Sequence, residues 1–194
     1  MYQKENTSIY KYFLRQVYKV YISLILLLNY FLRKKGKKKT SIFFGGAYSG
    51  NRGGTLVKVK RLKNVYSEDK INFNILYLLS NSIYYFYFFL KLFKNKIPII
   101  HNQNGVFYPA WYNGNYKIMN KLMSDQLKLA DYVFYQSKFC KYSSDKFLHK
   151  RKNKFEILYN ACDLNIFRPR LNKKINKKKI KILMTGSFRS YLYP

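Results

Sequence analysis

The stretch TSIFFGGAYSGNRGGTLVKVKRLKNVY, residues 40–66, decides the fold. A strand-like run at 40–44 leads into a glycine-rich loop at 45–54, and a helix-like run begins at Leu56. Glycine tolerates positive φ, and the N-terminus of the following helix offers unpaired N–H groups to an anion. The loop matches neither the dinucleotide fingerprint nor the P-loop pattern. It predicts either a contact for a phosphate or sugar hydroxyl, or an ordinary tight turn.

Despite the high positive charge of the chain, its composition argues against a protein that binds nucleic acid specifically. The chain has 194 residues, a formal net charge of +30 and 20% aromatic residues. Lysine greatly outnumbers arginine and is scattered, whereas base recognition favours the bidentate arginine fork. We expect no specific nucleic acid, and an anionic membrane surface is a credible partner. Cys140 and Cys162 have no CxxC or metal-ligand spacing, which favours a reduced, cytoplasmic compartment, either free or peripheral to the inner face of the membrane.

The N-terminal segment, residues 1–39, joins an apolar helix-like run to the basic run RKKGKKK. Lys19 and Asn29 interrupt the apolar residues, which are too few for a transmembrane helix. We expect a basic amphipathic helix that lies in a membrane interface. The alternative is a helix that packs on its own domain.

The order of strand-like and helix-like runs predicts a Rossmann-like parallel sheet with right-handed crossovers and helices on both faces, over residues 40–170. In such sheets, ligands bind beyond the carboxyl ends of the strands. The glycine loop, Ser80 with Asn81, and the segment HNQNG at 101–105 all follow predicted strands. We therefore expect the glycine loop and HNQNG at the same edge.

The segment HNQNGVFYPAWY, residues 101–112, places amides beside aromatic rings. Amide side chains donate to and accept from hydroxyls, and an aromatic face packs against the C–H side of a sugar ring. The segment predicts a sugar contact. The alternative is a turn at Asn104 and Gly105 with aromatic residues in the core.

Four elements in order carry a family resemblance. They are the glycine loop, ADYVFYQSKFCK at 130–141, ILYNACDLNIFRP at 157–169 and KILMTGS at 181–187. Together they resemble the N-terminal half of a GT-B-fold glycosyltransferase of family 4. The N-x-x-D element of that family corresponds to Asn160 and Asp163, followed by Phe167 and Pro169.

The resemblance implies sugar transfer with retention, from a nucleotide-sugar donor to a glycan or lipid-linked acceptor, with no metal ion and no cofactor. It implies His101 as the residue at the reacting centre. The implied substrate-binding residues are Gly45, Gly46, Gly53, Gly54, Asn102, Gln103, Asn104 and Trp111. Asn160 and Asp163 are expected to brace a turn through backbone hydrogen bonds.

The resemblance also implies a linker at 171–180 and a second domain, of which residues 181–194 hold only the first strand. We expect a truncated chain without activity by itself. Two rival functions remain. One is a non-catalytic, membrane-associated or sugar-binding remnant of the acceptor half, and the other is a nucleic-acid-binding protein, for which affinity would fall steeply with salt.

Overall fold

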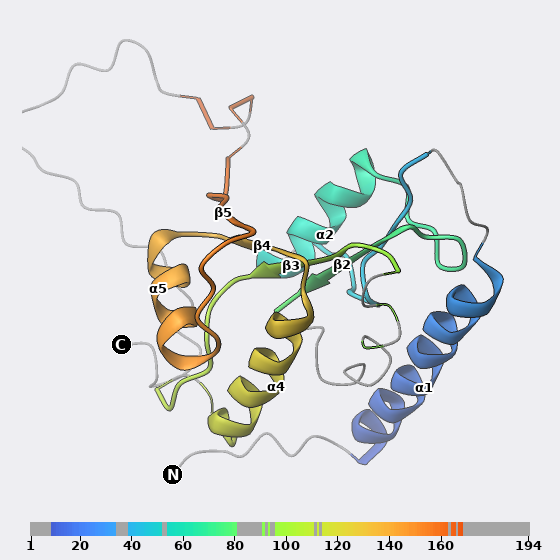
Figure 1. Ribbon diagram of the computed structural model, residues 1–194, viewed down its shortest axis with the longest axis horizontal. Helices are drawn as coiled ribbons and strands as arrows, with labels where there is room; N and C mark the ends of the chain where they lie inside the picture. The colour runs from blue at the N-terminus through green and yellow to red at the C-terminus, as the bar shows by residue number, and fades with distance from the viewer. Residues whose placement is uncertain are drawn as a thin grey trace, which may run out of the picture.

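The computed structural model has a five-stranded, fully parallel sheet whose strand order follows the chain (Figure 1). It describes residues 9–33, 39–51, 54–80, 91, 93, 96–110, 112, 114–162, 164–165 and 167–168. The strands are β1 (Ile42–Phe43), β2 (Ile75–Leu79), β3 (Ile99–Gln103), β4 (Tyr132–Tyr135) and β5 (Phe155–Ile157). The helices are α1 (Ile9–Leu32), α2 (Gly54–Val65), α4 (Tyr116–Leu129) and α5 (Lys138–Phe147). The expected α/β parallel sheet is confirmed.

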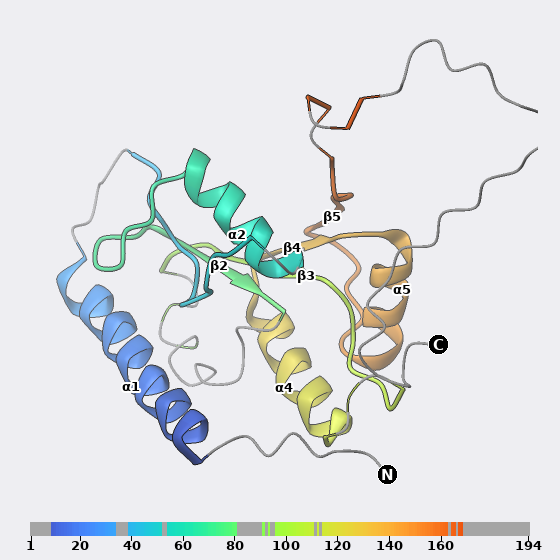
Figure 2. The ribbon, with the colours of Figure 1, turned by 180° about the vertical axis from the view of Figure 1, so that it is seen from behind.

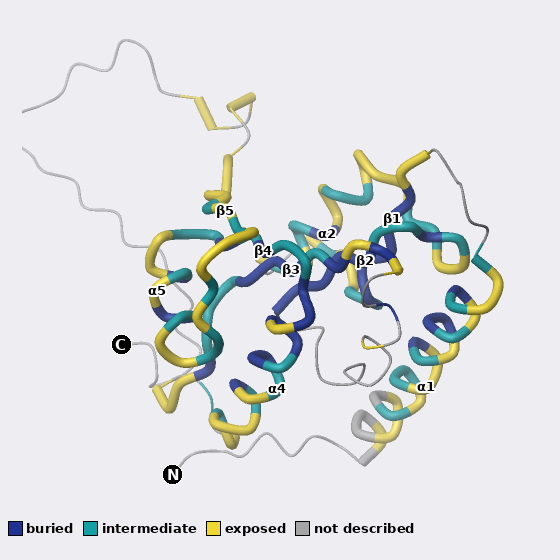
Figure 3. Tube along the Cα trace, viewed as in Figure 1, coloured by how far each residue is buried: buried dark blue, intermediate teal, exposed yellow. Residues whose placement is uncertain are grey.

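Helices cover both faces of this sheet, because successive strand residues point to opposite sides. Phe43, Leu76 and Ile99 lie in one apolar cluster with residues of α1, α4 and α5. Phe44 and Tyr77 lie in a second cluster, which α2 covers. Figures 1 and 2 show the same division, with α2 on one side of the strands and α1 and α4 on the other. In Figure 3 the central strands are the most deeply buried part of the chain.

The chain reverses its direction across the sheet at β1. The Ser41 carbonyl accepts a hydrogen bond from Ile75 N of β2, whereas the next carbonyl, that of Ile42, accepts from Asp69 N. Neighbouring carbonyls of a strand point in opposite directions, so Glu68 and Asp69, which follow α2, lie on the outer edge of β1. The chain then returns past Ser41 to β2. The isolated bridge of Glu68 and the strand β2 thus lie on opposite sides of β1, and a change of direction of this kind is where ligands of open α/β sheets commonly bind.

Helix α1 packs on its own domain through the side that faces the sheet. For that side, the alternative interpretation of the N-terminal segment, a helix packed on its own domain, is the correct one. Ile22, Ile25 and Leu26 belong to the first apolar cluster. Asn29 is fully buried, and its Nδ2 donates to the carbonyls of Phe73 (3.2 Å) and Ile71. No helix within the described ranges is both long enough and apolar enough to cross a membrane. Contact of α1 with a membrane surface stays a prediction.

One expected boundary is wrong. His101, Asn102 and Gln103 are strand residues of β3 and not part of a loop that follows it. His101 and Asn102 pair with both β2 and β4, Gln103 pairs with β4, and all three residues are buried. Polar strand residues are tolerated here because their side chains hydrogen-bond to interior partners. The linker at 171–180 and the strand at 181–187 lie outside the described residues.

Candidate functional site

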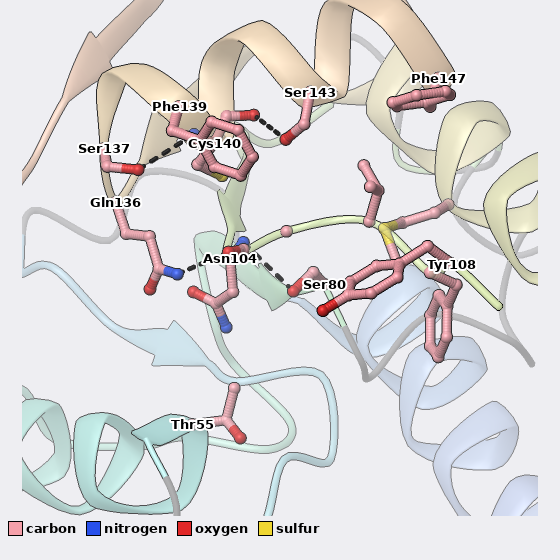
Figure 4. A pocket seen from close by; sticks show the side chains of 14 residues that line it. Thr55, Ser80, Asn104, Tyr108, Gln136, Ser137, Phe139, Cys140, Ser143 and Phe147 are labelled. Carbon is pink, nitrogen blue, oxygen red and sulfur yellow. Dashed lines mark hydrogen bonds between the residues drawn. The ribbon is translucent and has the colours of Figure 1, made fainter. Parts of the chain in front are cut away.

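A cavity of about 730 Å³ lies at the carboxyl edge of the sheet, at the ends of β2, β3 and β4 (Figure 4). We call it the edge cavity. Its size falls in the range of small-molecule sites. Three segments that the strands lead into and the first turn of α2 form its wall, and α4 and α5 complete it. The lining residues are Thr55, Ser80, Asn104, Gly105, Val106, Phe107, Tyr108, Met123, Gln136, Ser137, Phe139, Cys140, Ser143 and Phe147.

Hydrogen bonds from neighbouring elements hold the segment after β3 against the cavity. Asn104 N donates to Ser80 Oγ at 3.3 Å, and Gln136 Nε2 donates to the Asn104 carbonyl. The side chain of Asn120 in α4 makes two hydrogen bonds to the backbone of Phe107. Asn120 Oδ1 accepts from Phe107 N at 2.8 Å, and Asn120 Nδ2 donates to the Phe107 carbonyl at 2.9 Å. Ser80, Gln136 and Asn120 therefore fix the backbone of this segment. The aromatic side chains that it carries are preorganised for a ligand.

Helix α5 forms the opposite wall. Ser137, a residue type that favours the N-cap position, caps this helix, because Ser137 Oγ accepts from Cys140 N at 3.0 Å. Phe139, Ser143 and Phe147 follow at intervals of four residues and so share one side of the helix. Sequence reasoning missed this row, although four-residue spacing on a helix that leaves the carboxyl end of a strand is a signal that could have found it.

A buried hydrogen-bond chain runs from His101 to the cavity wall. His101 Nε2 lies 2.7 Å from Gln103 Oε1, and Gln103 Nε2 donates to Met123 Sδ at 3.1 Å and to the Gly105 carbonyl. The carboxamide nitrogen is the donor of Gln103, so its Oε1 accepts and His101 carries its proton on Nε2. Burial lowers the pKa of His101 to about 4, so the ring is neutral at pH 7.

This chain places His101 behind the cavity wall and not in contact with the cavity. The side chain has no exposed area, and Nδ1 has no hydrogen-bond partner among the described residues. Met123 and Gly105 do line the cavity. Within the described structure, His101 is therefore linked to the cavity wall through Gln103, and its direct contact with a sugar stays a prediction.

The side chains of Asn102 and Asn104 both accept hydrogen bonds from the same lysine. Lys58 Nζ of α2 lies 3.0 Å from Asn102 Oδ1 and 3.4 Å from Asn104 Oδ1. Asn102 also donates to Tyr77 Oη at 2.9 Å. Burial lowers the pKa of Lys58. The two amides are thus engaged with protein groups, and only Asn104 of this pair reaches the cavity.

The predicted glycines separate into two places. Gly45 and Gly46 have positive φ, 59° and 76°, and form a turn against α1, where Tyr18 Oη donates to the Gly46 carbonyl. Neither lines the edge cavity. Gly54 is the first residue of α2, one position before the lining residue Thr55. Both parts lie at the carboxyl edge of the parallel sheet, as expected, but the turn contacts α1 and the helix N-terminus contacts the cavity. Gly53 and Trp111 lie outside the described residues.

The described lining groups are neutral hydroxyl, amide, thiol, aliphatic and aromatic side chains. Among the described residues that line the edge cavity, none is a carboxylate, a histidine, a lysine or an arginine. Cys140 Sγ donates to the Gln103 carbonyl at 3.0 Å, and burial raises the pKa of this thiol to about 11, so it is no thiolate nucleophile at neutral pH. Within the described ranges, no group of three or more His, Cys, Asp or Glu side chains could hold a metal ion.

The cavity therefore combines an apolar wall with hydroxyl and amide groups. Val106, Phe107, Met123, Phe139 and Phe147 supply the wall. Thr55, Ser80, Asn104, Gln136, Ser137 and Ser143 supply the polar groups. Such a lining fits an uncharged, amphiphilic molecule with hydroxyl groups. Comparisons with protein-family models, with curated proteins and with solved structures found no match for this chain.

Proposed function

We propose that the edge cavity binds the acceptor of a glycosyl transfer, and that this chain is the acceptor side of a GT-B-fold glycosyltransferase of family 4. The observation that carries the proposal is the composition of the edge cavity, which joins aromatic and aliphatic side chains to neutral hydroxyls and amides at the carboxyl edge of a parallel sheet. A sugar with an apolar substituent presents the same two kinds of surface. The acceptor class is therefore a glycan or a lipid-linked sugar.

In this proposal the donor is a nucleotide-sugar held by a second domain, whose first strand the sequence predicts at 181–187. In this proposal the edge cavity supplies position and not a base, because no carboxylate or histidine stands among the described residues that line it. Its contribution to the rate is to hold the acceptor hydroxyl in near-attack geometry. The catalytic assignment of His101 becomes a positioning one, through Gln103 to the cavity wall.

Binding is the first test, because it does not require the donor. The probe is octyl glucoside below its micellar concentration, measured by titration calorimetry with the 194-residue chain. Glucose and octanol are the comparison ligands. We expect the octyl glycoside to bind at least about tenfold more tightly than either part, because only it fills both kinds of surface. Equal affinity for octanol would show a merely apolar cavity and would contradict the proposal.

A matched pair of variants on α5 locates the binding. Phe139 lines the edge cavity and is 75% exposed, whereas Tyr142 is 61% exposed on the same helix and does not line it. Phe139→Ala should weaken octyl glycoside binding about tenfold, since a partly buried aromatic contact contributes roughly 1–2 kcal/mol. Tyr142→Ala should leave it unchanged. Equal losses in both variants would place the ligand elsewhere.

Filling the cavity gives a second, independent variant. A Cβ added at Gly105 meets no atom within 4 Å, and Gly105 lines the cavity. Gly105→Leu should therefore abolish binding and leave the unfolding midpoint close to that of the wild type.

Transfer is then assayed with radiolabelled nucleotide-sugars, the octyl glycoside and a chain that carries a complete donor-binding domain. Transfer supports the enzyme, and its loss in Gly105→Leu ties it to the edge cavity. Binding without transfer supports the second candidate, a non-catalytic sugar-binding module.

A further inference from the structure

The side of α1 that faces away from the sheet carries a continuous row of exposed apolar side chains. We call this row the outer stripe. Its members recur every three or four residues, the spacing of one side of a helix. They are Tyr10, Phe13, Leu14, Val17, Val20, Tyr21, Leu24, Leu28, Phe31 and Leu32. At 1.5 Å per residue the row is roughly 33 Å long.

The outer stripe is distinct from the side of α1 that packs against the sheet. The packing face lies on the other side, where Ile22, Ile25, Leu26 and Asn29 are buried against the sheet. In Figure 3 the turns of α1 accordingly alternate between buried segments toward the sheet and exposed segments away from it. The helix thus has two apolar sides, of which one is used by the fold. A contiguous apolar surface of this extent marks an interaction site.

Cationic side chains from other parts of the chain flank the outer stripe. Lys70 Nζ donates to Tyr21 Oη at 3.2 Å and lies 5.6 Å from the centre of that ring. Lys96 Nζ lies 3.7 Å from the ring centre of Tyr30, next to Phe31, and its carbonyl accepts from Arg33 Nη1. The sequence has no Asp or Glu between Glu5 and Glu68. Glu68 itself pairs with Lys63 at 2.6 Å.

We propose that the outer stripe docks on the surface of an anionic lipid bilayer, with α1 parallel to the membrane plane. Apolar side chains then enter the boundary between headgroups and acyl chains, while the flanking ammonium and guanidinium groups reach lipid phosphates. The buried side keeps its contacts with the sheet, so the helix lies on the membrane and does not cross it. The proposal is independent of what the edge cavity binds.

Charge favours lipid over a second copy of the chain as the occupant. Pairing two outer stripes would bring the same cations together in a protein of net charge +30. An anionic bilayer instead supplies opposite charge, and each cation near it adds to the attraction. The same argument predicts binding that weakens as salt rises.

Vesicle flotation with the full chain tests the proposal. One set of vesicles is phosphatidylcholine, and the other contains about one third phosphatidylglycerol to give a negative surface. The chain should bind the anionic vesicles at least about tenfold more tightly than the neutral ones, and high salt should weaken that binding. Equal binding to both, binding to neither, or binding that high salt leaves unchanged would overturn the proposal.

Two combined variants separate the outer stripe from apolar surface in general. Phe13→Gln, Val20→Gln and Leu24→Gln change the stripe, and together they should lower affinity for anionic vesicles at least about tenfold. The control changes three exposed residues on other helices, Val65→Gln, Ile118→Gln and Tyr142→Gln. The control should bind as the wild type does, and an equal loss in both would overturn the assignment.

Two further measurements keep the result decisive. Phe31→Gln changes the most exposed member of the stripe, at 75%, and should weaken binding several-fold even if the triple variant unfolds. Sedimentation of the lipid-free chain detects a dimer. A dimer that the stripe variant dissociates, with no vesicle binding by the wild type, would assign the outer stripe to a second copy and overturn the lipid. Octyl glycoside binding should persist in the stripe variants.

Discussion

His101 is a neutral side chain in the interior of the sheet, and the hydrogen bonds of Gln103 link it to the wall of the edge cavity. That position makes protonation costly for the folded chain. Burial lowers the pKa of His101 to about 4, against 6.5 for an exposed histidine. As pH falls from 6.5 toward 4, the unfolded chain therefore takes up a proton that the folded chain does not. The stability contributed by neutral His101 is complete above pH 6.5 and is lost as pH falls toward 4.

The first prediction concerns this pH dependence. Between pH 6.5 and 4 the free energy of unfolding should fall by about 3 kcal/mol through His101 alone. Urea unfolding at several pH values measures it, and His101→Gln should remove this part of the fall while carboxylate titration remains. His149→Gln, which changes the other histidine, should keep the slope of the wild type. Parallel curves for the wild type and His101→Gln would show that His101 does not titrate in this way.

The second prediction concerns Gly46, whose conformation and surroundings both require glycine. Its φ is 76°, and an added Cβ would lie 2.7 Å from Ile22 Cδ1 of α1. Gly46→Ala should lower the free energy of unfolding by about 1–3 kcal/mol, because alanine is strained at this positive φ and the Ile22 side chain must move away from the new Cβ. Gly54→Ala, in the first turn of α2 with no atom near its Cβ, should be neutral or slightly stabilising. Thermal unfolding compares them, and equal midpoints would contradict the strain.

Among the elements, α4 and β5 are held together by one guanidinium group. Arg151 Nη2 donates to the carbonyls of Ala130 (2.7 Å) and Asp131 (3.0 Å), and Nη1 donates to Leu127 at 3.2 Å. Its Nε reaches the Lys154 carbonyl, directly before β5. A cation at the C-terminus of α4 also interacts favourably with the helix dipole.

The third prediction follows from this arrangement. Arg151→Met should destabilise the fold by roughly 2–3 kcal/mol, since several carbonyls lose a charged donor. Arg151→Lys should fall between Met and the wild type, because an ammonium group cannot span the same fork. Lys152→Met changes the adjacent, exposed residue and should cost less than about 0.5 kcal/mol. The midpoints of urea unfolding measure the stability of each variant. Equal losses of stability in Arg151→Met and Lys152→Met would contradict the anchoring role of Arg151.

At the scale of the whole molecule, repulsion between like charges dominates the electrostatics. The chain has 38 Lys and Arg against eight Asp and Glu. Such an imbalance destabilises a compact state through self-repulsion, and salt screens that repulsion more than it weakens a small number of ion pairs.

The fourth prediction is that salt stabilises the fold. Raising sodium chloride from about 0.01 to about 0.1 M shortens the Debye length from about 30 to about 10 Å, and the melting temperature should rise by several degrees. Potassium chloride at the same ionic strength should act equally, because the effect does not depend on the ion. A melting temperature that falls with salt would instead show that ion pairs dominate.

The sequence by itself determined the order of strands and helices, the parallel sheet, the positive φ of the glycine turn and the cap at Ser137. These features arise from local causes: the spacing of apolar residues, the steric freedom of glycine, and a hydroxyl placed to accept from a helix N–H. Even the wrong end of β3 had a local cause, because HNQ reads as a polar loop when its neighbouring strands are unknown.

Only the tertiary structure decided where those polar residues lie and what forms the site. Whether His101 is buried depends on pairing with β2 and β4, and the amides of Asn102 and Gln103 find their partners in Lys58, Tyr77 and Met123, far away in the sequence. The division of α1 into a covered side and an exposed side is equally nonlocal. Apolar spacing shows which residues share one side of a helix, but only packing decides which side is covered.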